Sequence, residues 1–153
     1  MKQFDDFPVG TRIRHLQGRT LGHEHRFLTS LCMNGVQLHF NQDFCEKDAV
    51  VRESFQGRIV VYGGYVFTLV RGLASPDLGE FAVREVGFAN GRHLRPCFEG
   101  DTIYAESEVV EAAPSPDDAR LGRLKVTLVG RNQAGDAVLE VEQIVDLPRR
   151  EGR

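Results

Sequence analysis

An amide and a histidine lie five residues apart in the segment Leu28–Asn41, LTSLCMNGVQLHFN: they are Asn34 and His39. An imidazole can accept and donate protons near neutral pH. Here an amphipathic helical pattern gives way to a glycine-containing loop, and such a junction can direct both side chains into one cavity. Each residue also has a structural interpretation, because a histidine between apolar neighbours often supports the core and Asn34 suits a left-handed helix C-cap.

Two glycines, Gly63 and Gly64, open an almost charge-free helical segment in GRIVVYGGYVFTLVRGL. The first N–H groups of a helix have no intrahelical partner and carry partial positive charge. They can therefore stabilise an oxygen on which negative charge develops. The same glycines could simply allow a turn and close packing, and Thr68, one turn later, could bond back to a carbonyl.

The other reactive residues point to no common chemistry. His23 and His25 are two residues apart, so on a helix they would face different directions, and no nearby carboxylate or cysteine completes a metal site. The motifs GxSxG, GxxxxGKS and GxGxxG are missing, so the sequence lacks the signatures of serine hydrolases, P-loop proteins and Rossmann proteins. Three basic residues lie on a predicted loop before Pro96: Arg92, His93 and Arg95. Such a cluster is usually solvated, although it could bind a phosphate.

The composition predicts one globular domain. The 153 residues are 41% hydrophobic and 27% charged, and the net charge of -3 argues against nucleic-acid binding. The first residues lack the apolar run of a signal peptide and no stretch approaches a membrane span, so we expect a cytoplasmic protein that does not bind membranes. The three cysteines are far apart and fit best as small buried apolar residues.

Apolar periodicity predicts a helix over residues 22–33, a second through 42–51 and a nearly buried one over 62–73. It predicts strands over 81–88, 102–111, 121–131 and 137–147, with a hairpin turn at 132–135. One buried helix followed by an antiparallel meander indicates an α+β domain in which a curved sheet wraps around the helix. Its uncovered edges predict a dimer with a shared sheet.

Four segments, in order, resemble the MaoC-like dehydratase family of hotdog-fold proteins, which contains the (R)-specific enoyl-CoA hydratases. They are FDDFPVGTRIRHLQGRTL, FLTSLCMNGVQLHF, GRIVVYGGYVFTLVRGL and RPCFEGDTI. The resemblance implies a single hotdog domain over residues 1–153, with a flexible tail from about residue 148.

In that family an aspartate and a histidine five residues later hold and activate the water that is added to a 2-enoyl-CoA. His39 falls on the histidine position and Asn34 on the aspartate position. The resemblance also implies that the N–H of Gly63 helps to bind the thioester oxygen and that Thr68 lines the site.

The chain departs from the family pattern at three places. The amide of Asn34 can position a water but cannot take its proton. Val36-Gln37 replaces the usual Asn-Pro, and Tyr62 replaces a proline, with one residue inserted before it. The segment CMNGVQLHF is similar to the corresponding motif in a branch of the family that carries this asparagine. The resemblance implies that related members act on CoA thioesters of the mesaconyl and itaconyl type.

The sequence therefore predicts a hydratase or dehydratase of an acyl-CoA thioester, working as a homodimer or higher oligomer without metal or redox cofactor. His39 would be acid and base, Asn34 would position water, and the N–H of Gly63 or Gly64 would bind the oxyanion. Three side chains would select the acyl chain: Val36, Tyr62 and Tyr65. Two alternatives are a hotdog thioesterase, disfavoured because residues 62–73 contain no carboxylate, and a non-catalytic acyl-CoA-binding module.

Overall fold

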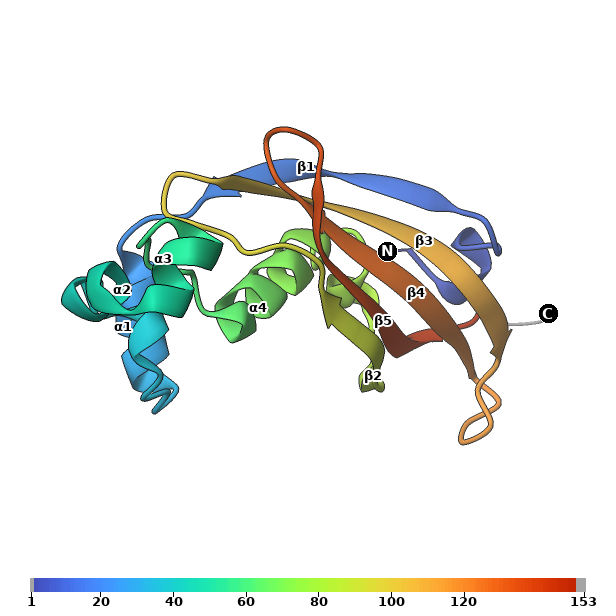
Figure 1. The fold of residues 1–153 in the computed structure, drawn as a ribbon. Helices are drawn as coiled ribbons and strands as arrows, with labels where there is room; N and C mark the ends of the chain where they lie inside the picture. Colours follow the sequence, from blue (N-terminus) through green and yellow to red (C-terminus); the bar gives the residue numbers. More distant parts are fainter. Residues whose placement is uncertain (1, 151–153) are drawn as a thin grey trace.

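The computed structural model describes residues 2–150 and places one long helix across the inner face of a curved, five-stranded antiparallel sheet (Figure 1). The strand order is β1-β3-β4-β5-β2. This arrangement confirms the predicted α+β architecture. Among the described residues, no helix has the length and apolar composition needed to cross a bilayer.

The three central strands form where the sequence predicts them. They are β3 (Thr102–Pro114), β4 (Leu121–Arg131) and β5 (Ala137–Pro148). Residues of β4 alternate strictly between buried and half-buried positions, because one face of the strand packs on the core. The predicted turn at 132–135 joins β4 to β5, and Gly135 there adopts φ +87°, a conformation that favours glycine.

The edge strands differ from the prediction. Strand β1 (Arg12–Thr20) was not predicted, because its residues are mostly exposed and show no apolar alternation. Strand β2 (Arg84–His93) starts and ends later than the predicted range 81–88, and the helical turn η3 (Gly79–Phe81) precedes it. Two register shifts interrupt its pairing with β5, so its sequence lacks a continuous period of two.

The N-terminal helices gather beyond one end of the sheet (Figure 1). Helix α1 (Glu24–Leu31) matches the first predicted helix, but the second is divided into α2 (Gln42–Lys47) and α3 (Ala49–Phe55). The division falls at Asp48, whose backbone is extended and whose carboxylate accepts a hydrogen bond from Val51 N. An aspartate in that conformation caps a new helix instead of continuing the old one. Two further helical turns are η1 (Phe4–Asp6) and η2 (Gln37–His39).

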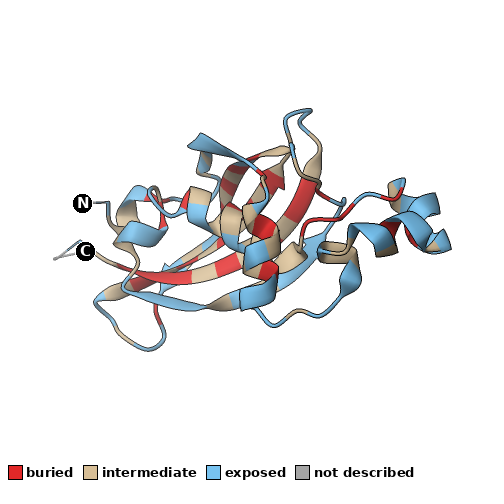
Figure 2. Cartoon of the chain, turned by 90° about the vertical axis from the view of Figure 1, so that its left-hand side faces the viewer, coloured by how far each residue is buried: buried red, intermediate tan, exposed pale blue. Residues whose placement is uncertain are grey.

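Helix α4 (Gly63–Ala74) contacts the sheet through one stripe of small apolar residues: Val66, Val70 and Ala74. A side chain at Gly130 of β4 would lie 2.5 Å from Val70 Cγ2, so glycine permits this close approach. The opposite face is not covered, because Thr68 and Gly72 are exposed. The prediction that the helix is nearly buried is therefore wrong for the single chain; in Figure 2 the strands of the sheet carry many of the buried residues, whereas the helices are largely intermediate or exposed.

The C-terminal end of the sheet is tied to the start of the chain. Pro148 is the last residue of β5, and Arg150 N donates a hydrogen bond of 2.8 Å to Asp5 Oδ2. The tail predicted from residue 148 thus begins within a strand, and its last part, 151–153, lies outside the described residues.

Candidate active site

His39 lies in η2 and is held by the segment that leads into α4. Its Nδ1 is 2.8 Å from Val60 O, and Val60 N in turn donates to Leu38 O at 3.2 Å. A carbonyl oxygen can only accept, so Nδ1 carries the proton. In the neutral ring Nε2 is then an unprotonated acceptor. The half-buried imidazole is therefore oriented as a base.

The start of α4 offers two unpaired backbone donors. Tyr62 O accepts from the N–H groups of Tyr65 and Val66, whereas no described residue accepts from the N–H of Gly63 or Gly64. The Tyr62 ring folds over Gly64, where an added Cβ would lie 2.5 Å from it. Glycine at position 64 permits this close contact with the Tyr62 ring, and the N–H groups at the helix start remain available to a ligand oxygen.

The structure brings His39 and the start of α4 together. The His39 and Tyr62 rings are 5.5 Å apart between centroids. Gly63 follows Val60 by three residues, so its Cα lies within roughly 11 Å of Val60 Cα. The His39 ring therefore lies near the helix start that carries the free N–H groups, and this combination suits the acid–base chemistry of a carbonyl compound.

Asn34 lies in the turn after α1, and its side chain is occupied locally. Its Oδ1 accepts from Val36 N at 2.9 Å, which leaves the side-chain NH₂ as a donor. The C-cap interpretation is wrong, because Met33 and not Asn34 takes the left-handed conformation, with φ +56°. Within residues 2–150 no hydrogen bond joins Asn34 to His39. The side chain of Val36 is exposed.

The two remaining predicted residues contact other parts of the protein. Thr68 Oγ1 donates to Gly64 O at 2.9 Å, which is the predicted back-bond, and its side chain lies on the exposed face of α4. Tyr65 OH donates to Glu24 Oε1 at 3.3 Å and so links α4 to α1. Burial, together with the nearby carboxylate of Glu24, raises the pKa of Tyr65 above its usual value.

His93 contacts the start of α4, and sequence analysis did not assign it to the site. It was expected in a loop, but it ends β2, and its ring lies against Gly63: an added Cβ there would be 2.7 Å from His93 Nε2. Its basic neighbours are paired elsewhere, Arg92 with Glu140 at 2.6 Å and Arg95 with Asp136 at 3.5 Å. The only signal in the sequence was an exposed histidine in a basic cluster.

His23 and His25 converge, contrary to prediction. His23 Nδ1 is 2.9 Å and His25 Nε2 is 3.0 Å from the same oxygen, Glu99 Oε1. The guanidinium of Arg26 lies 3.0 Å from that oxygen and supplies the opposite charge. No group of His, Cys, Asp and Glu within residues 2–150 has a geometry that would hold a metal ion.

A Ser-His-Asp chain also occurs, but in the core. His15 lies 2.7 Å from Asp77 Oδ2 and 2.5 Å from Ser107 Oγ. His15 and Ser107 are 3% and 5% exposed, respectively. A serine nucleophile needs access to substrate, so this chain is a structural link between β1, β3 and the segment after α4.

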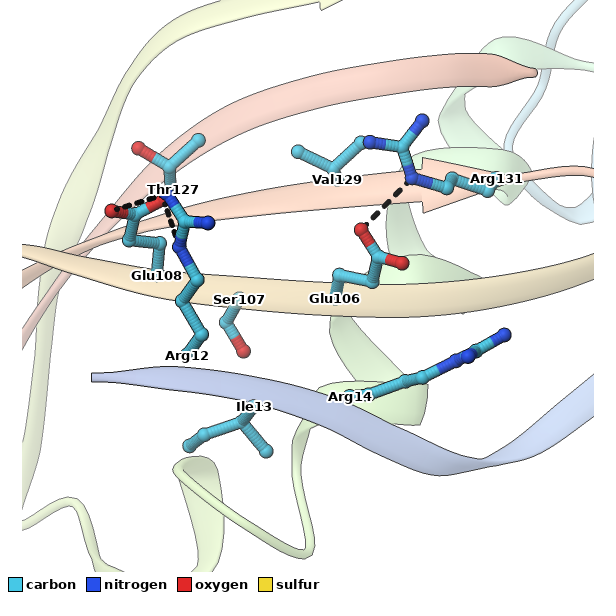
Figure 3. Close-up of a pocket in the computed structure, with 9 residues that line it drawn as sticks. All are labelled: Arg12, Ile13, Arg14, Glu106, Ser107, Glu108, Thr127, Val129 and Arg131. Atoms are coloured by element: carbon cyan, nitrogen blue, oxygen red, sulfur yellow. Dashed lines mark hydrogen bonds and ion pairs between the residues drawn. The ribbon is translucent and has the colours of Figure 1, made fainter. Parts of the chain in front are cut away.

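The cavity in Figure 3 has a volume of about 480 Å³ and lies between β1, β3 and β4. Two ion pairs cross it, Arg12 with Glu108 at 3.1 Å and Arg131 with Glu106 at 2.9 Å. None of the residues predicted for the site lines it. The candidate site is therefore the open region at the start of α4.

Comparison with known proteins agrees with this architecture. A MaoC domain protein dehydratase from Chloroflexus aurantiacus superposes with a TM-score of 0.84 and is 33% identical; the match covers 97% of this chain and 45% of that one. The chain thus has the hotdog fold, and its architecture is that of a MaoC-like protein. More specifically, the mesaconyl-CoA hydratase model matches residues 2–145, and the chain belongs to that family.

Two curated relatives extend the comparison. The β-methylmalyl-CoA dehydratase of Chloroflexus aurantiacus is 34% identical over 96% of this chain and 44% of its own length. The mesaconyl-CoA hydratase of Cereibacter sphaeroides is 37% identical over 83% of this chain and 34% of its own length. The chain therefore spans less than half the length of either relative.

Proposed function

We propose that the protein is a hydro-lyase that reversibly adds water to a 2-enoyl-CoA thioester, with mesaconyl-CoA as the first substrate to test. The observation that carries the proposal is the His39 imidazole, fixed by Val60 O beside a helix start whose first two N–H groups are free. The family and the names of both curated relatives support the choice of substrate.

The reaction needs a base for water, an acid for the α-carbon and donors for the thioester oxygen. His39 Nε2 would accept the proton of the attacking water. The N–H groups of Gly63 and Gly64 would hold the thioester oxygen while it gains negative charge. Asn34 would position the water through its NH₂ group, in place of the family's aspartate.

Specificity for the acyl chain would come from side chains around this location. Tyr62 directly precedes the proposed oxyanion donors, and Val36 lies two residues after Asn34, the residue proposed to position water. Tyr65 extends toward α1. The substrate is the only small-molecule partner that the proposal requires, and no bound metal or redox cofactor enters it.

The decisive experiment follows the absorbance of mesaconyl-CoA, crotonyl-CoA and itaconyl-CoA with the wild-type protein and with His39→Ala. We expect turnover of the wild type and a loss of about a hundred- to ten-thousand-fold in the variant, the range for removal of a general base. Equal inactivity of both proteins, with thioester binding retained, would favour a binding module. Release of free thiol by the wild type would favour a thioesterase.

A further inference from the structure

With Asn34 in place of an aspartate, the proposed site lacks a second group that can transfer protons. Addition of water to a 2-enoyl thioester moves two protons, one from the water and one to the α-carbon. An amide can transfer neither. In the predicted mechanism His39 must therefore both take the proton from the water that attacks the β-carbon and give a proton to the α-carbon. Its ring, however, is fixed by a single hydrogen bond to Val60 O.

A second imidazole, that of His93, lies against the helix start that would hold the thioester oxygen. The Nε2 and Cε1 atoms of His93 are 2.7 and 2.8 Å from the position of a Cβ on Gly63. The α-carbon of a thioester is two bonds from its carbonyl oxygen. If the N–H groups of Gly63 and Gly64 hold that oxygen, a group that touches Gly63 can come within reach of the α-carbon.

The surroundings leave His93 able to exchange protons. Its ring is exposed and makes no hydrogen bond to any residue in the range 2–150, so both nitrogens are free to meet solvent or a ligand. Arg92 and Arg95 on either side are paired with Glu140 and Asp136. His39, by contrast, has one nitrogen occupied and the other oriented as a base.

We propose that His93 is the second proton carrier of the site, an inference that rests on the proposed hydro-lyase function. In the hydration direction, His39 Nε2 takes a proton from water as oxygen bonds to the β-carbon. The π electrons move to the thioester oxygen at Gly63 and Gly64. The His93 imidazolium then donates a proton to the α-carbon as the thioester carbonyl re-forms, and solvent restores both rings.

The test compares wild type and His93→Gln with mesaconyl-CoA, and then with the hydrated thioester carrying deuterium at the α-carbon. We expect kcat of the variant to fall by about a hundredfold while KM stays within about threefold. The α-deuterium isotope effect on dehydration should rise, because cleavage of the α-carbon bond becomes limiting. A purely structural role for His93 would leave the isotope effect unchanged.

His23→Gln is the matched control, since His23 is also an exposed histidine but contacts Glu99 instead of Gly63; it should retain wild-type kinetics. A His93→Gln protein with kcat within about threefold of wild type, or with a lower kcat and an unchanged isotope effect, overturns the inference alone. A wild-type protein that binds the thioester without turnover overturns the proposed function together with this inference.

Discussion

The side-chain amide of Asn34 has one structural role and one proposed catalytic role. Substitution by aspartate replaces only its nitrogen by oxygen and so changes the second role while keeping the first. The amide Oδ1 accepts from Val36 N and so shapes the turn after α1. Its NH₂ group is the part that would position water. An aspartate can keep the first role, because a carboxylate oxygen accepts equally well, and can additionally take a proton.

We therefore expect Asn34→Asp to preserve kcat with mesaconyl-CoA or to raise it, by up to about tenfold, in a steady-state absorbance assay. Asn34→Ala, which loses both the turn hydrogen bond and the donor, is the comparison and should lose activity. A large fall in kcat for the aspartate variant, with an unchanged circular dichroism spectrum, would show that the role of Asn34 is misassigned.

At the scale of elements, one buried carboxylate ties the far end of the sheet together. Asp146 of β5 is fully buried; Arg123 of β4 and Arg84 of β2 reach it at 2.8 and 2.6 Å, and Ser115 donates at 3.2 Å. These hydrogen bonds, that of Arg123 first, lower the pKa of Asp146 to about 2 in spite of its burial.

Asp146→Asn should destabilise the fold by about 3 kcal/mol at pH 7, because Arg84 and Arg123 lose their buried counter-ion and keep only the exposed carboxylate of Asp117. A lowered folded-state pKa stabilises the protein fully above the ordinary value of 3.8, and the contribution is lost as pH falls toward about 2. Urea unfolding of the wild type should show this decline between those pH values, and the variant should show a smaller one, because Asp117 and Asp118 also have a lowered pKa. Asp43→Asn, which breaks an exposed pair with Lys47, should change little.

The strands and helices also show which parts of the fold can be predicted from local sequence. Strands β4 and β5 were predicted nearly residue by residue, because their alternation reports one buried face. Strand β1 was missed because its residues are mostly exposed and show no apolar alternation. The apolar period continues through Asp48, so it predicted one helix. The break between α2 and α3 could be predicted only from the helix-capping hydrogen bond of the Asp48 side chain.

Some residues of the candidate site could likewise be predicted from local sequence, and one could not. The stretches around His39 and Gly63 carried their chemistry in short motifs, so both were proposed from sequence. His93 lies 30 residues beyond Gly63 and reaches it only because β2 pairs with β5, which in turn places the strand end over the start of α4. That contact depends on tertiary structure, and nothing in the spacing of the two residues reports it.

The whole molecule leaves two surfaces open in the single chain: the free edge of β2 and the outer face of α4. Val86 and Phe88 of β2 are 40% and 39% exposed, which is unusual for apolar residues on an unpaired edge. This exposure supports the prediction that a second hotdog unit pairs with β2, and we propose a second copy of this chain as that unit.

If two copies share the β2 edge, sedimentation equilibrium should give about twice the monomer mass of 17.1 kDa. Val86→Asp should shift that equilibrium toward monomer by about tenfold or more, because an aspartate at the paired edge adds like charges related by the two-fold axis. Leu16→Asp is the matched control: Leu16 is 96% exposed on β1, at the opposite edge of the sheet. Dissociation by the Leu16 variant alone would place the interface on β1, and a monomeric wild type would exclude the shared sheet. Loss of mesaconyl-CoA turnover in step with dissociation would further mean that the open face of α4 needs the partner to complete the site.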